Sequence, residues 1–121
     1  MKYILFIPGW RPAVTNELMG HWAKAAKLKK RDREVVWKSA LAERIPAARG
    51  KRHLDIHIFL EKKRGRKLDP DACLKSGLDA LVQSRLLRDD SAEWCEWTAP
   101  TISTADEHRW GTRFILEDME K

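Results

Sequence analysis

The chain has 121 residues, of which 43% are hydrophobic and 35% are charged, and its formal net charge is +6. A chain of this length is expected to form one domain, residues 1–121, with a core that needs no disulfide or metal support. No apolar run approaches the roughly 20 residues of a membrane-spanning helix, and the first residues lack the pattern of a signal peptide. Two cysteines, Cys73 and Cys95, are too few for a disulfide framework. We therefore expect a globular cytoplasmic protein with reduced thiols and no membrane partner.

Basic and acidic residues are divided unevenly along the chain. Residues 1–67 contain 18 Lys and Arg against 6 Asp and Glu, a net charge of +12, whereas residues 68–121 contain 6 against 12, a net charge of −6. Such a division predicts a polyanionic partner that binds the first part. Acids help to hold a polyanion only where a metal ion lies between them and a phosphate. An ordinary solvated surface is the alternative explanation.

The N-terminal part predicts one strand and one long helix. Residues 2–7 are rich in aromatic and branched side chains, which favours a strand. The prolines and glycine of residues 8–12 then predict a loop. From about residue 18 to residue 44 apolar side chains recur at helical spacing, with many lysines and arginines between them and a possible break near Arg31 and Asp32. The predicted inner positions of this helix are Leu18, Trp22, Ala25, Ala26, Val36, Trp37, Ala40 and Leu41.

The central part predicts a second strand and a second helix. Residues 53–60 alternate between polar and apolar side chains, so Leu54, Ile56, Ile58 and Leu60 share one face of a strand. After a basic loop, Asp69 as N-cap and Pro70 at the first helical position predict the start of a helix that ends near residue 86.

The C-terminal part predicts two more strands, at residues 93–98 and 110–116, joined by a polar loop at residues 101–108. The resulting order is β-α-β-α-β-β. This order predicts the α+β class: a single small domain with two main helices packed on a mixed β-sheet.

Carboxylates stand two residues apart at the start of the second helix, at Asp69 and Asp71. A third carboxylate, from Asp89 or Asp90 beyond the helix, would complete a site for one Mg²⁺ ion, which takes oxygen ligands and keeps several waters. A metal ion bound there to a phosphodiester can activate water for hydrolysis, and Lys75 would stabilise the charge that develops. The alternative is structural, because acids stabilise the first turn of any helix and Asp71 with Lys75 is a common i,i+4 pair.

A run of cations directly precedes these acids. It consists of Lys62, Lys63, Arg64, Arg66 and Lys67. Cations of this kind bind DNA phosphates and position the substrate without reading its sequence. A solvated loop between strand and helix is the alternative.

Two further sets of residues carry weaker signals. His53, Asp55 and His57 share one face of the predicted strand, where their spacing allows a zinc or iron site. A half-exposed strand face is the favoured explanation, because no fourth ligand is evident. The chain also has six tryptophans, of which Trp22 and Trp37 are predicted to be core residues. Tryptophans elsewhere are expected in the core, stacked on unpaired bases or in a subunit interface.

The acidic and basic residues of the second helix resemble the signature of the RusA family of Holliday junction resolvases. The matching positions are Asp69, Asp71, Lys75 and Asp79, followed ten residues later by Asp89 and Asp90. The match covers residues 64–91, and it extends loosely to the N-terminal strand and its proline-rich loop. Ala72 is a departure, since the family often has Asn at that position.

The resemblance implies a RusA-like fold and names the site. It implies metal ligation by Asp69, Asp71 and Asp90, with Lys75 as the catalytic cation and Mg²⁺, or Mn²⁺, as the metal. It also implies a homodimer, a four-way DNA junction as partner and a bacterial or phage-encoded protein. Two-fold symmetry fits paired cuts on two strands, because a symmetric dimer supplies two equivalent sites.

The sequence therefore predicts a metal-dependent, structure-selective DNA endonuclease that resolves Holliday junctions in recombination and repair. A non-catalytic basic DNA-binding protein is the first alternative, and it leaves the acids beside the basic loop unexplained. A metal nuclease acting on other DNA or RNA forms is the second.

Overall fold

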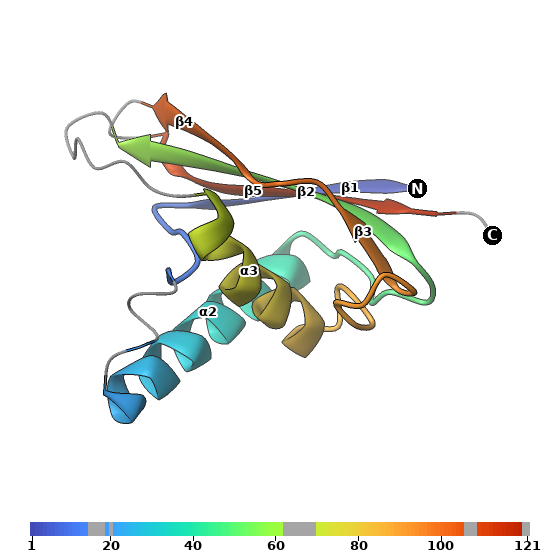
Figure 1. Cartoon of the computed structure of the whole chain (residues 1–121). Coiled ribbons are helices and arrows are strands. Elements are labelled where there is room, and N and C mark those ends of the chain that lie inside the picture. The colour runs from blue at the N-terminus through green and yellow to red at the C-terminus, as the bar shows by residue number, and fades with distance from the viewer. Residues whose placement is uncertain (15–18, 20, 62–69, 106–108, 120–121) are drawn as a thin grey trace.

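The computed structural model describes residues 1–14, 19, 21–61, 70–105 and 109–119. Two helices lie on one face of a mixed sheet (Figure 1). In chain order the elements are β1 (Lys2–Pro8), α2 (Trp22–Ala42), β2 (Arg52–Glu61), α3 (Pro70–Gln83), β3 (Cys95–Trp97), β4 (Thr101–Ala105) and β5 (Gly111–Asp118). The predicted α+β class, with two helices on a mixed sheet, is confirmed, and the sheet has one strand more than predicted.

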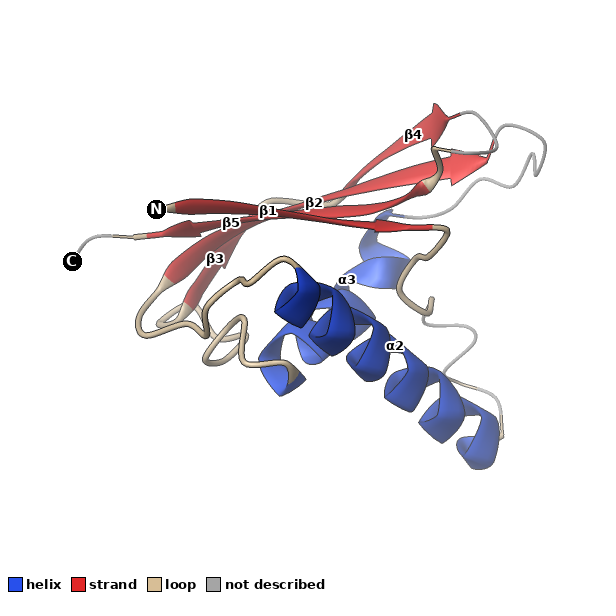
Figure 2. Cartoon of the chain, turned by 180° about the vertical axis from the view of Figure 1, so that it is seen from behind, coloured by secondary structure: helices blue, strands red, loops and turns tan. Residues whose placement is uncertain are grey.

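Strand β2 lies inside the sheet, between antiparallel and parallel neighbours. It pairs antiparallel with β5, which pairs antiparallel with β1, so β1 forms one edge. On its other side β2 pairs in parallel with β3 at its start and with β4 at its end. Viewed from behind, both helices remain on the same side of the sheet (Figure 2).

The additional strand, β4, falls in the segment predicted to be a polar loop. Cys95 pairs with Arg52 and Thr101 pairs with His57, so an advance of six residues on the β3–β4 side matches an advance of five residues on β2. Strands β3 and β4 therefore act as one interrupted edge strand with a one-residue insertion, as in a β-bulge. Pro100, which has no backbone N–H, lies in the interruption. Strand β4 contains Ser and Thr side chains, so it lacks the alternation of apolar residues by which strands are predicted from sequence.

The core lies between the sheet and the helices. Leu54, Ile56 and Ile58 of β2 are buried, as the alternation predicted, and Leu60 is half-buried. They pack in one cluster with β5 residues such as Phe114 and with apolar residues of both helices. Burying each such side chain stabilises the fold by about 1.5–3 kcal/mol.

Helix α2 is continuous through the predicted break. Asp32 is buried in the middle of the helix, where its carboxylate accepts hydrogen bonds from Trp10 Nε1 (3.1 Å) and from the backbone N–H of Ala13 (2.9 Å). The prediction of a break was wrong because this polar residue turns inward and fixes the loop that follows β1.

The placement of two tryptophans in the core was also wrong. Trp22 is 78% exposed and Trp37 is 51% exposed. Helix α2 buries only a narrow row of side chains, Asp32, Val36 and Ala40, because it packs mainly against α3 and the edge of the sheet.

No helix in the described ranges is long and apolar enough to cross a membrane.

Helix α3 starts at Pro70, as predicted, and ends at Gln83, earlier than predicted. Arg85 adopts a left-handed φ of 64°. The N–H of Leu86 donates to the carbonyl of Leu81 (3.0 Å), and that of Arg85 donates to the carbonyl of Val82 (3.0 Å). These bonds form a Schellman motif with arginine where glycine is usual, so the sequence contained no glycine to mark the end of the helix.

Candidate functional site

A row of charged side chains follows one side of α3. Asp71 is in the first turn of the helix and is exposed, Lys75 is exposed one turn later, and Asp79 is half-buried after one further turn. Spacing of four residues places these side chains on the same side of a helix. Leu78 and Leu81, on another side of α3, are buried in the core. The row therefore lies along the part of α3 that is turned away from the core.

Two parts of the predicted site lie outside the described residues. One is Asp69, the predicted N-cap and first metal ligand. The other is the cation run Lys62, Lys63, Arg64, Arg66 and Lys67. Their roles in metal and DNA binding stay predictions.

Asp90 lies at the opposite end of α3 from Asp71. Between Asp71 and Gln83 the helix axis advances by about 18 Å at 1.5 Å per residue. The segment that follows α3 packs at the start of β2, where Leu86 O accepts a hydrogen bond from Arg52 Nη1 (2.9 Å). Asp71, in contrast, belongs to the end of α3 that follows β2 along the chain.

The electrostatics of a nearby thiol support this placement of Asp90. Burial raises the pKa of Cys95 to about 11, and the negative charge of Asp90 contributes to that rise. Cys95 is the register partner of Arg52, the first residue of β2. Asp90 and its neighbour Asp89 are both exposed at this end of the molecule.

The described residues of one chain therefore do not bring Asp71 together with Asp90 or Asp89. Across the described ranges, no group of three or more His, Cys, Asp or Glu side chains is arranged to hold a metal ion. A magnesium site with two or three carboxylates thus does not fit Asp71 and Asp90 of a single chain. The three-carboxylate site stays a prediction that needs another source for one ligand.

The alternating residues of β2 do not form the zinc or iron site that their spacing allowed. His53 lies between two carboxylates, with Nε2 3.5 Å from Asp55 and Nδ1 3.7 Å from Glu96. His57 lies further along the strand and contacts Ser103 and Arg113 instead. The histidines have different partners, so the three residues do not converge.

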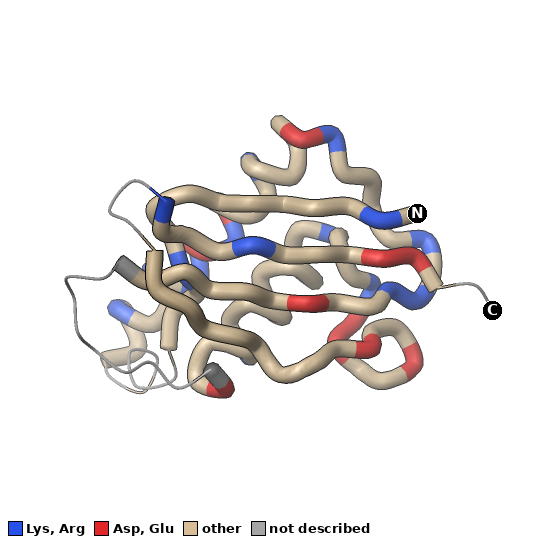
Figure 3. Tube along the Cα trace, turned by 90° about the horizontal axis from the view of Figure 1, so that it is seen from above, with Lys and Arg blue, Asp and Glu red and all other residues tan. Residues whose placement is uncertain are grey.

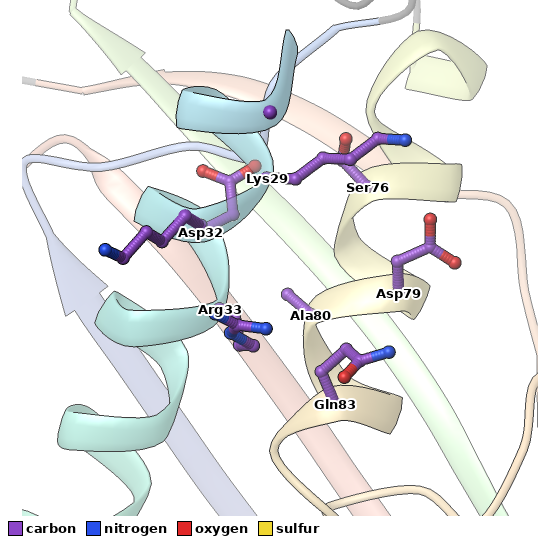
Figure 4. Close-up of a pocket in the computed structure, with 9 residues that line it drawn as sticks. Lys29, Asp32, Arg33, Ser76, Asp79, Ala80 and Gln83 are labelled. Carbon is purple, nitrogen blue, oxygen red and sulfur yellow. The ribbon is translucent and has the colours of Figure 1, made fainter. Parts of the chain in front are cut away.

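A basic groove of about 480 Å³ lies between α2 and α3 (Figure 4). Its lining consists of Ala26, Lys29, Lys30, Asp32, Arg33, Ser76, Asp79, Ala80 and Gln83. The small side chains of Ala26 and Ala80 leave room between the helices. Three cations, two acids and two neutral polar side chains thus border one space.

The acids of the groove differ in their availability. The Asp32 carboxylate is occupied by Trp10, Ala13 and Arg31, whose Nη2 lies 2.8 Å from Oδ1. Asp79 belongs to the charged row of α3 and also lines the groove. The charged row and the basic groove are therefore adjacent.

The remaining cations of α2 extend the basic surface beyond the groove. Lys27, Arg31 and Lys38 line a second depression of about 350 Å³, which shares Lys30 with the first. Lys24 is exposed nearer the start of the helix. The sequence indicated the basic character of α2, but the facing Ser76 and Gln83 could be found only once the pairing of the two helices was known.

In comparisons with known proteins, no family model matches this chain. No curated protein matches it either.

Proposed function

We propose that the protein is a metal-dependent endonuclease that cuts branched DNA, with the four-way junction as its substrate. The observation that carries the proposal is the position of Asp79, which joins the charged row of α3 to the basic groove. A phosphate backbone bound along the groove would pass beside Asp71 and Lys75. The resemblance of residues 64–91 to RusA resolvases supports the same activity.

The groove suits a phosphate backbone better than a base edge. Lys29, Lys30 and Arg33 are exposed cations that can each contact a phosphate. Ser76 and Gln83 add hydrogen-bonding groups on the α3 side. Contacts of this kind position DNA without reading its sequence, as recognition of a branched shape requires.

The separation of Asp71 and Asp90 leads to a two-chain site. The two carboxylates stand at opposite ends of α3 within one chain, whereas ligands of one cation must lie within a few ångströms of it. In a two-fold dimer, Asp71 of one chain and Asp90 of the other can meet, and the symmetry then forms two such sites. We propose that each site combines carboxylates from two chains.

Each residue then has a distinct task. The bound cation would activate water and stabilise the leaving oxygen of the phosphodiester. Asp71, with Asp69, would hold it at the start of α3, while Lys75 would offset the negative charge of the reacting phosphate. The cations of the groove hold the strand in place.

The test is cleavage of a synthetic four-way junction with Mg²⁺, compared with a linear duplex of the same sequence. We expect cleavage of the junction alone. Asp71→Asn should lower the cleavage rate by orders of magnitude while junction binding persists, because a ligand is lost and negative charge is removed. Glu117→Gln, on β5, is the control that removes an exposed carboxylate from the sheet. Absence of cleavage with either Mg²⁺ or Mn²⁺ contradicts the proposal.

A non-catalytic DNA-binding protein is the second candidate. It is favoured by the groove between α2 and α3, whose exposed cations can contact phosphates without any metal ion. It predicts tight junction binding that is equal with and without Mg²⁺ and is never followed by cleavage.

A further inference from the structure

The face of the sheet opposite the helices carries a compact group of aromatic and basic side chains. Figure 3 looks onto this open face, where most of the strand positions are neither acidic nor basic. The group, here called the aromatic–arginine patch, consists of Phe6 on β1, His57 and Phe59 on β2, Ser103 on β4 and Arg113 on β5. The proposed cleavage site, on α3, does not use it.

The patch is held together by ring contacts across three strands. The rings of Phe6 and Phe59 approach edge to face, with centroids 6.3 Å apart. Gly111, on β5, is the register partner of Phe59 and of Pro8, and a Cβ on it would lie 3.0 Å from Phe6 Cζ. The missing side chain of Gly111 therefore lets Phe6 lie over the backbone of β5. Phe6 keeps 40% of its surface exposed.

Arg113 gives the patch a positive charge with a fixed position. Its Nη2 lies 3.2 Å from His57 Nδ1, and its guanidinium carbon lies 5.3 Å from the centre of the Phe59 ring. Since arginine only donates, His57 Nδ1 accepts, and Nε2 then carries the proton and donates to Ser103 Oγ (2.8 Å). Burial and the charge of Arg113 lower the pKa of His57, which keeps this ring neutral.

The guanidinium has no anionic partner in the described part of the chain. No carboxylate of the described residues forms an ion pair with Arg113, and its buried Nε has no hydrogen-bond partner there. Partly buried charges are normally paired. An unpaired guanidinium beside an exposed aromatic ring therefore marks a site for an anion attached to a flat apolar group.

We propose that the aromatic–arginine patch binds single-stranded nucleic acid, with a phosphate at Arg113 and a base stacked on Phe6. Arginine binds phosphate through paired N–H groups, and bases stack on aromatic side chains without regard to sequence. A second copy of this chain fits less well, because a two-fold contact centred on the patch would bring two Arg113 guanidinium groups together. The proposal goes beyond cleavage and does not depend on it.

The binding test uses a fluorescein-labelled oligothymidylate, with anisotropy measured in EDTA so that cleavage plays no part. Phe6→Ala and Arg113→Gln should each weaken binding by about fivefold or more. Arg113→Gln should also lower the slope of log affinity against log salt by about 0.7, the value for one phosphate on a single strand. Ile4→Ala is the matched control: Ile4 is on the same face of the same strand and is 58% exposed. It should leave binding unchanged.

Two further measurements keep the test decisive. Phe6→Leu keeps an apolar side chain of similar volume but loses the ring face, and Arg113→Lys keeps the positive charge but loses the planar guanidinium. If Phe6→Ala or Arg113→Gln unfolds, these two milder variants should still weaken binding. Sedimentation of the wild type and of Phe6→Ala separates nucleic-acid binding from self-association. Wild-type protein that does not bind the oligothymidylate, equal loss in Ile4→Ala, or loss of a dimer in Phe6→Ala would overturn the proposal. Junction cleavage that persists in all these variants leaves the proposed endonuclease intact.

Discussion

Removal of the three cations that line the α2–α3 groove should weaken DNA binding and flatten its salt dependence. The variant is Lys29→Ala, Lys30→Ala and Arg33→Ala together. Each phosphate contact contributes about 0.9 to the slope of log affinity against log salt on duplex DNA. Three contacts contribute about 2.7, so a fourfold rise in salt should change wild-type affinity about fortyfold more than variant affinity. These side chains are exposed, so the free energy of unfolding should change little.

The assay is fluorescence anisotropy of a labelled four-way junction in EDTA, repeated between about 50 and 200 mM salt. The control removes three exposed cations that line neither the groove nor the adjoining depression: Lys2→Ala, Arg49→Ala and Arg109→Ala. It lowers the net charge by the same amount, so it measures the effect of overall charge. A groove variant and a control variant with the same slope would refute the assignment of the groove to the phosphate backbone.

Three other predictions concern buried polar groups. Asp32→Ala should lower the free energy of unfolding in urea by about 3–5 kcal/mol, because two buried N–H donors lose their acceptor, whereas Glu34→Ala on the exposed side of α2 should cost less than about 1 kcal/mol. The pKa of His57 is lower in the folded state than its usual value of 6.5. Its contribution to stability is therefore present above pH 6.5 and is lost as the pH falls through the folded-state pKa. His57→Gln should flatten the pH dependence of urea unfolding in that range. Cys95 should resist alkylation in the native protein, since its pKa is about 11, and Asp90→Asn should lower that pKa, which a thiol titration by absorbance can detect.

The parts of the fold that were predicted correctly depend on local patterns. The alternation in β2 separates buried from exposed side chains, and the proline at the start of α3 marks the first turn of that helix. The parts that were missed depend on partners remote in sequence. Strand β4 exists because its backbone pairs with β2, and Trp37 is exposed because α2 packs along a narrow row. Neither fact is encoded in the spacing of apolar residues.

In the candidate site, too, local spacing was predicted correctly and a contact between remote residues was not. The spacing of Asp71, Lys75 and Asp79 placed them correctly on one side of a helix. The resemblance implied that Asp90 would join them by returning from beyond the helix, but a helix of 14 residues separates its two ends by about 20 Å. Asp90 lies beyond Gln83, in a segment that packs at the start of β2, so it does not return to Asp71 within the described residues of one chain. The sequence therefore suggested the ligand types, and a site shared between two chains is our proposal for bringing them together.

The most direct test of the two-chain site is cleavage by mixed dimers of Asp71→Asn and Asp90→Asn. Each variant alone should be inactive on a four-way junction with Mg²⁺. When the two are refolded together, half of the dimers combine one chain of each kind, and each such dimer has one site with both carboxylates intact. We predict that nicking returns to about a quarter of the wild-type number of sites. No return of nicking, with an active wild type and mixed dimers confirmed by mass, would contradict the account.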